Sequence, residues 1–389
     1  MRELPLGELL DVIIDHRGKT PKKLGGDFTE TGVPVVSAIH IKDGRIHWHE
    51  RFRYVSPEMY KRWMPVPLRT GDVLVTSEAP LGEVSQVPSD DPLVLSQRLF
   101  ALRGKAEILD STYLRYFLQS PDAQHRLRMR ATGTTVTGIR QSELVKVLVP
   151  LPLLEEQRRI VGVLGALEVL IETNRLVAEG ICELSRTYFE SLTSRCVGTY
   201  RLGDVAKVNA RKATPHTEGR IQYVDIASLS DGSIDWPGRI SWAVAPSRAR
   251  RLATDGNTLW STVRPNRRAH ALLVNAPDDL IVSTGIAVIA PMVIGPAYLY
   301  AATDRQDFTD HLVNRAEGSA YPAVRADAFE AALIPRLCDD DAAAFEAVMW
   351  PLWQAVAELG REQAELVRAR DELLPLLLSG AIRVDAVEA

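Results

Sequence analysis

The chain has 389 residues, of which 46% are hydrophobic and 25% are charged, and its formal net charge is −4 at pH 7. This length allows two or three domains, and this composition excludes a disordered or fibrous protein. The sequence has no 18-residue apolar run, no apolar signal-peptide block at its start, and only three scattered cysteines. We therefore expect a cytoplasmic protein with reduced thiols and no membrane partner.

Residues 1–153 are predicted to form a first globular domain. The segment opens on Leu6-Gly7, passes through Thr20-Pro21, and continues into strand-like residues 33–39 that lead to Asp43-Gly44. An Asp-Gly pair between β-rich runs predicts a hairpin. A second β-rich run follows a turn at Gly71, and Tyr113-Leu114 opens a helical stretch.

Residues 154–196 are predicted to form a long helix with one narrow apolar seam. Apolar residues recur there every three or four positions, with charged residues between them, which is typical of a coiled coil. A matching run occupies residues 339–381, and residues 382–389 form a tail. Pro351 and Pro375 lie in the second run and predict a kink near Trp350 and fraying towards its end. The two seams comprise Ile160, Leu164, Leu167, Ile171, Ile181, Tyr188 and Leu192 in the first helix, and Met349, Leu352, Val356, Leu366, Leu373 and Leu377 in the second.

Residues 197–338 repeat the order of features found in the first domain. Leu202-Gly203, Thr214-Pro215 and Asp231-Gly232 recur in sequence, and Tyr298-Leu299 follows Tyr113-Leu114 by 185 residues. The second seam follows the first at the same offset, so the chain contains an internal repeat. Insertions and different side chains distinguish the two globular copies. The predicted fold is therefore α/β (α+β), with two pseudo-repeated globular domains separated by two long antiparallel coiled-coil helices.

No catalytic or metal-binding motif stands out. Gly18-Lys19-Thr20 resembles the end of a phosphate loop, but position 13 is an isoleucine where that loop needs glycine. His47 and His49 alternate on a strand without cysteine or aspartate support, which does not favour a metal site. The sequence also lacks a Gly-x-Ser-x-Gly elbow and the Asp/Asn-Pro-Pro-aromatic motif of adenine methyltransferases. The absence of any recognisable chemistry motif favours a binding role without a metal, although the many acidic residues leave a cryptic carboxylate pair open.

Basic and polar residues gather instead in predicted loops of both globular domains, which carry slightly more lysine and arginine than aspartate and glutamate. Lysine and arginine neutralise phosphates, and arginine and asparagine can read base edges. Taken singly, such residues are usually an ordinary solvated surface, but their recurrence in matching loops favours DNA binding for the set. The candidates are Arg17, Lys19, Lys22, Lys23, Arg98, Thr134, Thr135, Lys207, Arg211, Lys212, Arg264, Asn266, Arg267, Arg268 and Tyr321.

This layout resembles the specificity (S) subunit of type I restriction-modification systems. The resemblance rests on the repeated seam, the paired Leu-Gly openings, the glycine turns at Gly133 and Gly318, and the Val149–Gln157 passage into the first helix. It covers the whole chain. The second junction, residues 334–339, lacks the Glu-Glu-Gln of the first, which puts the strength of the second partner contact in doubt.

The resemblance implies that each globular domain is a target recognition domain for one half of a split site in double-stranded DNA. It implies that the helices set the gap and dock two modification (M) subunits, which bind S-adenosylmethionine and methylate adenine. It further implies that this chain is itself non-catalytic, with no cofactor of its own, and that two restriction (R) subunits, which use ATP and magnesium, can join the complex. Two alternatives remain open at this point: a recognition subunit of another phage-defence assembly, and a self-contained nuclease with a cryptic carboxylate site.

Overall fold

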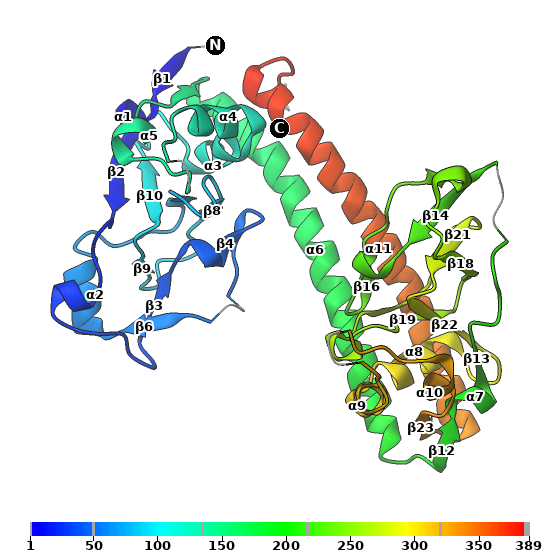
Figure 1. Ribbon diagram of the computed structural model, residues 1–389. Coiled ribbons are helices and arrows are strands. Elements are labelled where there is room, and N and C mark those ends of the chain that lie inside the picture. Colours follow the sequence, from blue (N-terminus) through cyan, green and yellow to red (C-terminus); the bar gives the residue numbers. More distant parts are fainter. Residues whose placement is uncertain (1, 49–50, 134–135, 215–217, 319–320, 385–389) are drawn as a thin grey trace. The chain divides into compact units, whose positions relative to one another are not determined.

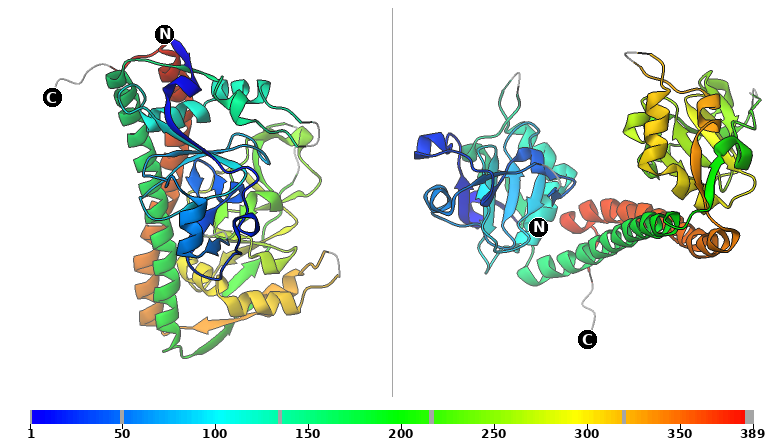
Figure 2. Two further views of the ribbon diagram at one scale, coloured as in Figure 1. Left: turned by 90° about the vertical axis from the view of Figure 1, so that its left-hand side faces the viewer. Right: turned by 90° about the horizontal axis from the view of Figure 1, so that it is seen from below.

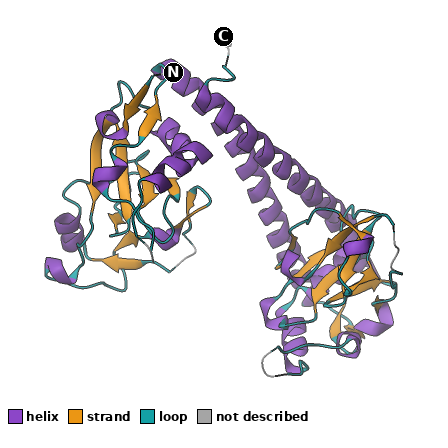
Figure 3. Cartoon of the chain, turned by 45° about the horizontal axis from the view of Figure 1, so that its top comes forward, coloured by secondary structure: helices purple, strands orange, loops and turns teal. Residues whose placement is uncertain are grey.

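The computed structural model of the protein describes residues 2–48, 51–133, 136–214, 218–318 and 321–384. The chain divides into two compact units, residues 1–171 with 365–389 and residues 172–364 (Figure 1). Each unit combines strands and helices (Figure 3), which confirms the predicted α+β class. Among the described residues, no helix has both the length and the apolar character needed to cross a lipid bilayer.

The first unit is built on a four-stranded antiparallel sheet in the order β2-β10-β7-β8. Alternate residues of its strands serve two cores, as the two-residue period of a strand requires. Val73 and Val75 of β7 join the core under the helices, whereas Leu74 joins the core shared with a smaller sheet. The strands are β1 (Glu3–Pro5), β2 (Leu10–Asp15), β3 (Val33–Val36), β4 (Ile41–Lys42), β5 (Arg45–Ile46), β6 (Arg53–Val55), β7 (Val73–Thr76), β8 (Val84–Gln86), β9 (Val94–Leu95), β10 (Leu99–Gly104) and β11 (Leu148–Pro150).

Helices α2, α3 and α4 of the first unit begin where the sequence supplies a capping side chain. Asp110 accepts hydrogen bonds from the N–H groups of Thr112 and Tyr113 at 2.8 and 3.1 Å and so starts α3. Ser120 caps α4, whose first residue is Pro121. The Asp43-Gly44 pair has positive φ at both residues and closes the predicted β4–β5 hairpin. The helices are α1 (Leu6–Leu9), α2 (Pro57–Trp63), α3 (Ser111–Gln119), α4 (Pro121–Met129) and α5 (Gln141–Leu144).

The second unit repeats this architecture. Its central sheet has the order β13-β22-β19-β20, and a second four-stranded sheet has the order β17-β14-β21-β18. Trp260 of β19 joins the core under the helices while its neighbour Leu259 joins the opposite core. The strands are β12 (Gly198–Arg201), β13 (Ala206–Val208), β14 (Arg220–Val224), β15 (Leu229–Ser230), β16 (Ser233–Ile234), β17 (Ile240–Ser241), β18 (Ala249–Leu252), β19 (Thr258–Ser261), β20 (His270–Leu272), β21 (Leu280–Ser283), β22 (Ile286–Pro291) and β23 (Leu333–Arg336). The helices are α7 (Leu202–Val205), α8 (Pro296–Thr303), α9 (Gln306–Asn314) and α10 (Ala326–Glu330).

Individual contacts show that the repeat in the sequence is a repeat in structure. The hydroxyl of Tyr113 donates to the carbonyl oxygen of Pro150 at 2.8 Å, and the hydroxyl of Tyr298 donates to that of Pro335 at 2.7 Å. Tyr298 follows Tyr113 by 185 residues, and Pro335 follows Pro150 by the same number. The Leu-Gly openings form the one-turn helices α1 and α7, where each glycine lies against a later segment too closely to carry a side chain freely.

Two long helices contribute to both units. α6 (Leu154–Thr193) has 40 residues and α11 (Asp339–Ser379) has 41, and the two lie side by side (green and orange to red in Figure 2). Ile160 and Leu164 from the start of α6 share a core with Leu377 from the end of α11. Conversely, Leu192 near the end of α6 shares a core with Met349 near the start of α11. The helices are therefore antiparallel.

The prediction that the second helix frays towards its end because of its prolines is wrong. α11 continues through Pro351 and Pro375 to Ser379 without an interruption or a frayed end. Both prolines lie on the exposed side of the helix, and the buried residues Trp353 and Leu378 anchor the turns that follow them. Tertiary packing of this kind overrides the local cost of a missing N–H group.

Candidate nucleic-acid interface

The richest basic loop of the second unit is the arginine loop, defined here as Arg264–Arg268 between β19 and β20. Arg264 and Arg268 both adopt the left-handed backbone conformation, with φ of 52° and 53°, on either side of a short 3₁₀ turn. Residues other than glycine avoid this region, at a cost of roughly 1–2 kcal/mol each. Such strain persists only where the surrounding structure holds it, and it gathers at functional sites.

One end of the arginine loop is held by the segment that includes Tyr321. The N–H of Arg264 donates to the carbonyl oxygen of Pro322 at 2.8 Å, and Val263 forms a bridge with Ala323. The guanidinium carbon of Arg264 lies 4.8 Å from the centre of the Tyr321 ring. This distance is typical of a cation–π contact, which fixes the direction in which the half-buried guanidinium group points.

The other end of the loop is held by a buried carboxylate. Arg268 turns its side chain inward and donates to Asp304 Oδ1 at 2.5 Å, to the Asp304 carbonyl oxygen at 2.7 Å and to Thr309 Oγ1 at 3.0 Å. Asp304 follows α8, and its side chain is only 5% exposed. Arg186 of α6 donates to the second oxygen, Oδ2, at 2.7 Å. Both oxygens of Asp304 are thus paired with arginines.

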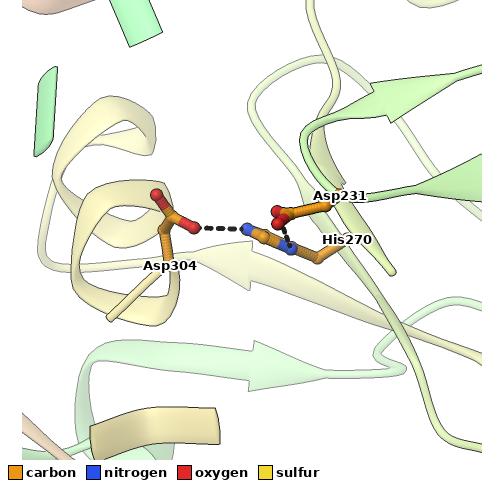
Figure 4. A group of neighbouring side chains, drawn as sticks. All are labelled: Asp231, His270 and Asp304. Carbon is orange, nitrogen blue, oxygen red and sulfur yellow. Dashed lines mark hydrogen bonds and ion pairs between the residues drawn. The ribbon is translucent and has the colours of Figure 1, made fainter. Parts of the chain in front are cut away.

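His270 completes this ion cluster (Figure 4). Its Nε2 lies 2.9 Å from Asp304 Oδ1, and its Nδ1 lies 2.7 Å from the carbonyl oxygen of Arg268. The fully buried ring also stacks on Trp260, with ring centres 4.6 Å apart. Burial favours a higher pKa for the Asp304 carboxyl, but the hydrogen bonds from His270 and Arg186 outweigh it and lower that pKa.

Asp231, His270 and Asp304 could in geometry hold a metal ion, since their ligand atoms lie within 4.8 Å of one another. The charges around these three residues do not favour a metal ion. Arg268 and Arg186 approach Asp304 at hydrogen-bond distance, and Arg268 Nε lies 3.5 Å from Asp231 Oδ2. Two fixed guanidinium groups already balance the two carboxylates, so the cluster acts as an internal ion network that locks the arginine loop.

A hollow of about 880 Å³ opens beside the arginine loop. Arg264, Arg267, Arg248 and Tyr321 contribute to its lining, together with Asp225. Within the described residues, the ion pairs of the arginine loop belong to Arg268. Arg264 and Arg267 therefore bring positive charge to the hollow, and Arg267 is exposed. An aromatic face and donor-rich side chains around a hollow suit nucleic acid.

The first unit also has a left-handed residue followed by proline at the corresponding place, but with a cis peptide bond between them and with different side chains. Ala79 repeats the left-handed conformation of Arg264, with φ of 52°, and Pro80 follows it as Pro265 follows Arg264. Gln124 donates to the carbonyl oxygen of Gly82 at 2.7 Å, whereas its counterpart 185 residues later, Thr309, accepts from the side chain of Arg268 at 3.0 Å. The scaffold is repeated, whereas the chemistry of the loop is not.

Four segments of the first unit meet around its own basic residues. Arg17 pairs with Asp15 at 2.8 Å and reaches the carbonyl oxygen of Ile139 at 3.4 Å. Gln97 donates to the carbonyl oxygen of Lys19 at 2.7 Å, and Arg98 pairs with Glu78 at 3.0 Å. A second hollow, of about 510 Å³, is lined by Arg17, Arg140, Gln141, Ser142 and Val145. The structure thus brings Arg17, Lys19 and Arg98 together, and Lys22 and Lys23 lie exposed on the adjoining 3₁₀ turn.

The remaining predicted DNA contacts are more dispersed. Arg211 and Lys212 are exposed and tied to β18 by backbone contacts, while Asn266 is exposed within the arginine loop. Lys207 pairs with Ala290, near the end of β22. Gly285, immediately before β22, contacts Thr262 in the turn after β19, so Lys207 lies at the opposite end of β22 from the arginine loop. Thr134 and Thr135 lie outside the described residues.

The predicted seam positions are all buried or half-buried in the structure. Ile160, Leu164, Ile171, Leu192, Met349 and Leu377 are buried, and Leu167, Ile181, Tyr188, Leu352, Val356, Leu366 and Leu373 are half-buried. Asn174 donates across the pair to Glu362 Oε2 at 3.1 Å. Gln157 ties α6 to the first unit, because it accepts from the N–H of Asp110 and donates to the carbonyl oxygens of Ile108 and Pro152.

Sequence reasoning missed the residues that position the arginine loop. Asp304 and His270 are 34 residues apart and neither belongs to a recognisable motif. Arg248, on the rim of the hollow, opens the basic run Arg248–Arg251, which was not among the candidates drawn from the sequence. For the arginine loop, the signal in the sequence was the Arg264–Arg268 run itself, which predicts the loop but does not identify the residues that hold it in place.

Comparison with known proteins gives consistent matches. Residues 1–179 match the family model described as the type I restriction modification DNA specificity domain. The type I restriction enzyme MjaVIII specificity subunit of Methanocaldococcus jannaschii is 28% identical over 181 residues, which cover 45% of this chain and 41% of that protein. The MjaIX specificity subunit of the same organism is 22% identical over 342 residues, covering 81% of this chain and 78% of that protein. The crystal structure of a type I restriction-modification S subunit from M. genitalium matches with a TM-score of 0.62 at 17% identity, covering 99% of this chain and 96% of that one.

Proposed function

We propose, on the premise that residues 1–179 match the model of the type I restriction modification DNA specificity domain, that the chain belongs to this family and that the whole chain is the DNA-reading subunit of a type I complex. Each globular part reads one half of a two-part site in double-stranded DNA. The first comprises residues 1–153 and the second residues 197–338. The long helices, residues 154–196 and 339–381, set the spacer. Because the proposed binding partner is DNA, we expect the chain to act in the cytoplasm.

The observation that carries this proposal is the repetition of a scaffold with different loops. Both units have the same strand order in their central sheets and the same Tyr–Pro contact beneath their helices. At matching places the first unit has Ala79 and Glu78, while the second has Arg264 and Val263. A protein that must read two different sequences with one architecture needs this division between scaffold and surface, because base recognition depends on a few side chains.

The proposal assigns the chemistry to partners rather than to this chain. Two M subunits would bind S-adenosylmethionine and methylate adenine, and R subunits would use ATP and magnesium. The exposed apolar side chains of α6 in the second unit, Leu176 and Leu184, would offer a contact surface to an M subunit. This chain contributes the address at which the partners act.

The test is single-molecule methylome sequencing of a host that carries the M subunit, with and without this chain. The expected result is adenine methylation at a two-part sequence, with a fixed gap, only when the chain is present. Methylation at one contiguous sequence would contradict the proposal. So would the absence of chain-dependent methylation when the M subunit is active.

A further inference from the structure

Arg264 combines three features that single it out among the basic residues of the second unit. Its backbone is held in the left-handed conformation, its N–H is bonded to Pro322, and its guanidinium group lies over Tyr321. Arg267, two residues past Pro265, is exposed on the same hollow. A group held in one direction suits a target with a fixed geometry, whereas a mobile charge suits a phosphate.

Guanine is the base that such a group fits. Its major-groove edge presents two acceptors, O6 and N7, which match the parallel donors of one guanidinium group. Stacking on an aromatic ring sets the plane of the guanidinium, so that little conformational entropy is lost when both hydrogen bonds form. A phosphate would accept the same cation in many orientations and would not select one orientation of the guanidinium group.

The ion cluster explains how the strained loop is kept in place. Arg268 reaches Asp304 and Thr309, Arg186 neutralises the other oxygen of Asp304, and His270 lies between Asp304 and the carbonyl oxygen of Arg268. This network fixes the far end of the loop four residues from Arg264. Arg268 is thereby a positioning residue, turned away from the hollow, and not itself a DNA contact.

We propose that Arg264 reads a guanine in the half-site of the second unit, stacked on Tyr321 and positioned by the Arg268–Asp304–His270 cluster. The inference rests on the proposed function and adds to it the base that is read and the residue that reads it. Arg267 contacts a phosphate at the same hollow.

The first experiment is methylome sequencing with the assembled complex carrying Arg264→Ala, Arg264→Lys or Arg267→Ala. With Arg264→Ala, one G·C pair of the second half-site should relax to any pair, with roughly a ten- to hundredfold loss of discrimination there. Arg264→Lys should relax the same pair, because lysine has no guanidinium fork. Arg267→Ala should weaken all sequences equally and lower the salt slope of binding by about one unit.

Arg336→Ala is the matched control. Arg336 also stacks on a tyrosine of the second unit, with its guanidinium carbon 5.1 Å from the ring centre of Tyr200, but it lies on β23 and does not line the hollow. Its removal should leave every base preference unchanged. The first half-site, read by the other unit, serves as an internal measure that each variant complex is folded.

A second experiment replaces the guanine with 7-deazaguanine, which lacks the N7 acceptor. Binding of the unmodified complex should weaken, and binding of the Arg264→Ala complex should not. Arg268→Lys should relax the same G·C pair as Arg264→Ala, and the double variant should relax it no further, since both act on one interaction. A merely structural role of Arg268 would lower the melting temperature without selecting one base pair.

Several outcomes would overturn the inference. If Arg264→Lys restores full discrimination, or if Arg264→Ala weakens all sequences equally, Arg264 binds a phosphate. A two-part methylated site whose second half contains no G·C pair would overturn the reading of guanine while leaving the proposed function intact. Failure of the unmodified chain to direct methylation to any two-part site would instead contradict the proposed function.

Discussion

Glu346 of α11 caps a helix from a different part of the second unit. Its carboxylate accepts hydrogen bonds from the N–H groups of Ala297 and Tyr298, at 3.2 and 3.0 Å, at the start of α8. A carboxylate there complements the helix dipole. Gly295 makes room for it, since a β-carbon at that position would come within 2.2 Å of the carboxyl group.

Glu346→Gln should change how the stability of the second unit depends on pH. Burial raises the pKa of Glu346 against the opposing effect of the two hydrogen bonds. The folded state therefore holds the proton more tightly than the unfolded state, and the unmodified protein loses stability as the pH rises above the ordinary glutamate pKa of about 4.3. Relative to it, the glutamine variant should gain stability over that rise, measured as melting temperature against pH. A difference that is constant across the rise, or of opposite sign, would contradict this assignment.

At the residue scale, the sequence showed which loops are basic but not which of their side chains turn inward to bind other residues of the protein. The run Arg264–Arg268 was recognisable as basic and loop-forming because its arginines and its proline are adjacent in the sequence, next to a predicted strand. That Arg268 turns inward depends on Asp304, and that Glu346 caps α8 depends on Gly295, far away in the chain. Local pattern carries no information about such long-range partners.

The helix pair allows a test at the scale of elements. Leu376 and Leu377 are adjacent in α11, yet Leu377 is 2% exposed in the core with Leu164, and Leu376 is 39% exposed. Leu377→Ala should cost about 2–5 kcal/mol, and Leu376→Ala should stay within about 0.5 kcal/mol of the unmodified protein. Calorimetric midpoints of both variants check this. Equal effects would show that the face of α11 has been misassigned.

The elements themselves followed largely from periodicity. A seam with a spacing of three and four residues is visible in the sequence because helical neighbours are near in sequence. The behaviour at Pro351 and Pro375 was not, because the buried residues that hold α11 together there, Trp353 and Leu378, act through tertiary contacts. The β4–β5 hairpin was visible in Asp43-Gly44 alone, since few residues tolerate two successive positive φ angles.

At the scale of the whole molecule, the proposed spacer role makes the helix length a functional variable. The Asn174–Glu362 hydrogen bond sets which residues of α6 and α11 are opposite one another. Deleting residues 175–178 together with residues 358–361 removes about one turn, or roughly 6 Å, from each helix in register. The methylome should then show the same half-sites with a gap shortened by about one or two base pairs. The matched control deletes only residues 175–178, which breaks the register and should abolish methylation. An unchanged gap in the double deletion would remove the helices from the spacer role.

The repeat was the most informative feature of the sequence at this scale, because two copies of a weak pattern support each other. The division into compact units was less accessible. The predicted boundaries at residues 153 and 338 follow the ends of the globular runs, whereas each unit also takes a part of both long helices. The contacts that make this division, such as Ile160 with Leu377, join residues more than 200 positions apart.

That division has a consequence for the order in which the protein is made. The core of the first unit includes Leu374, Leu377 and Leu378, whereas the second unit is complete at residue 364. A ribosome releases residues 1–171 first, yet they cannot close their core until the end of α11 has been synthesised. The unit that begins the chain is therefore the last to finish folding, and it has the longest exposure to chaperones, proteases and misfolding during translation.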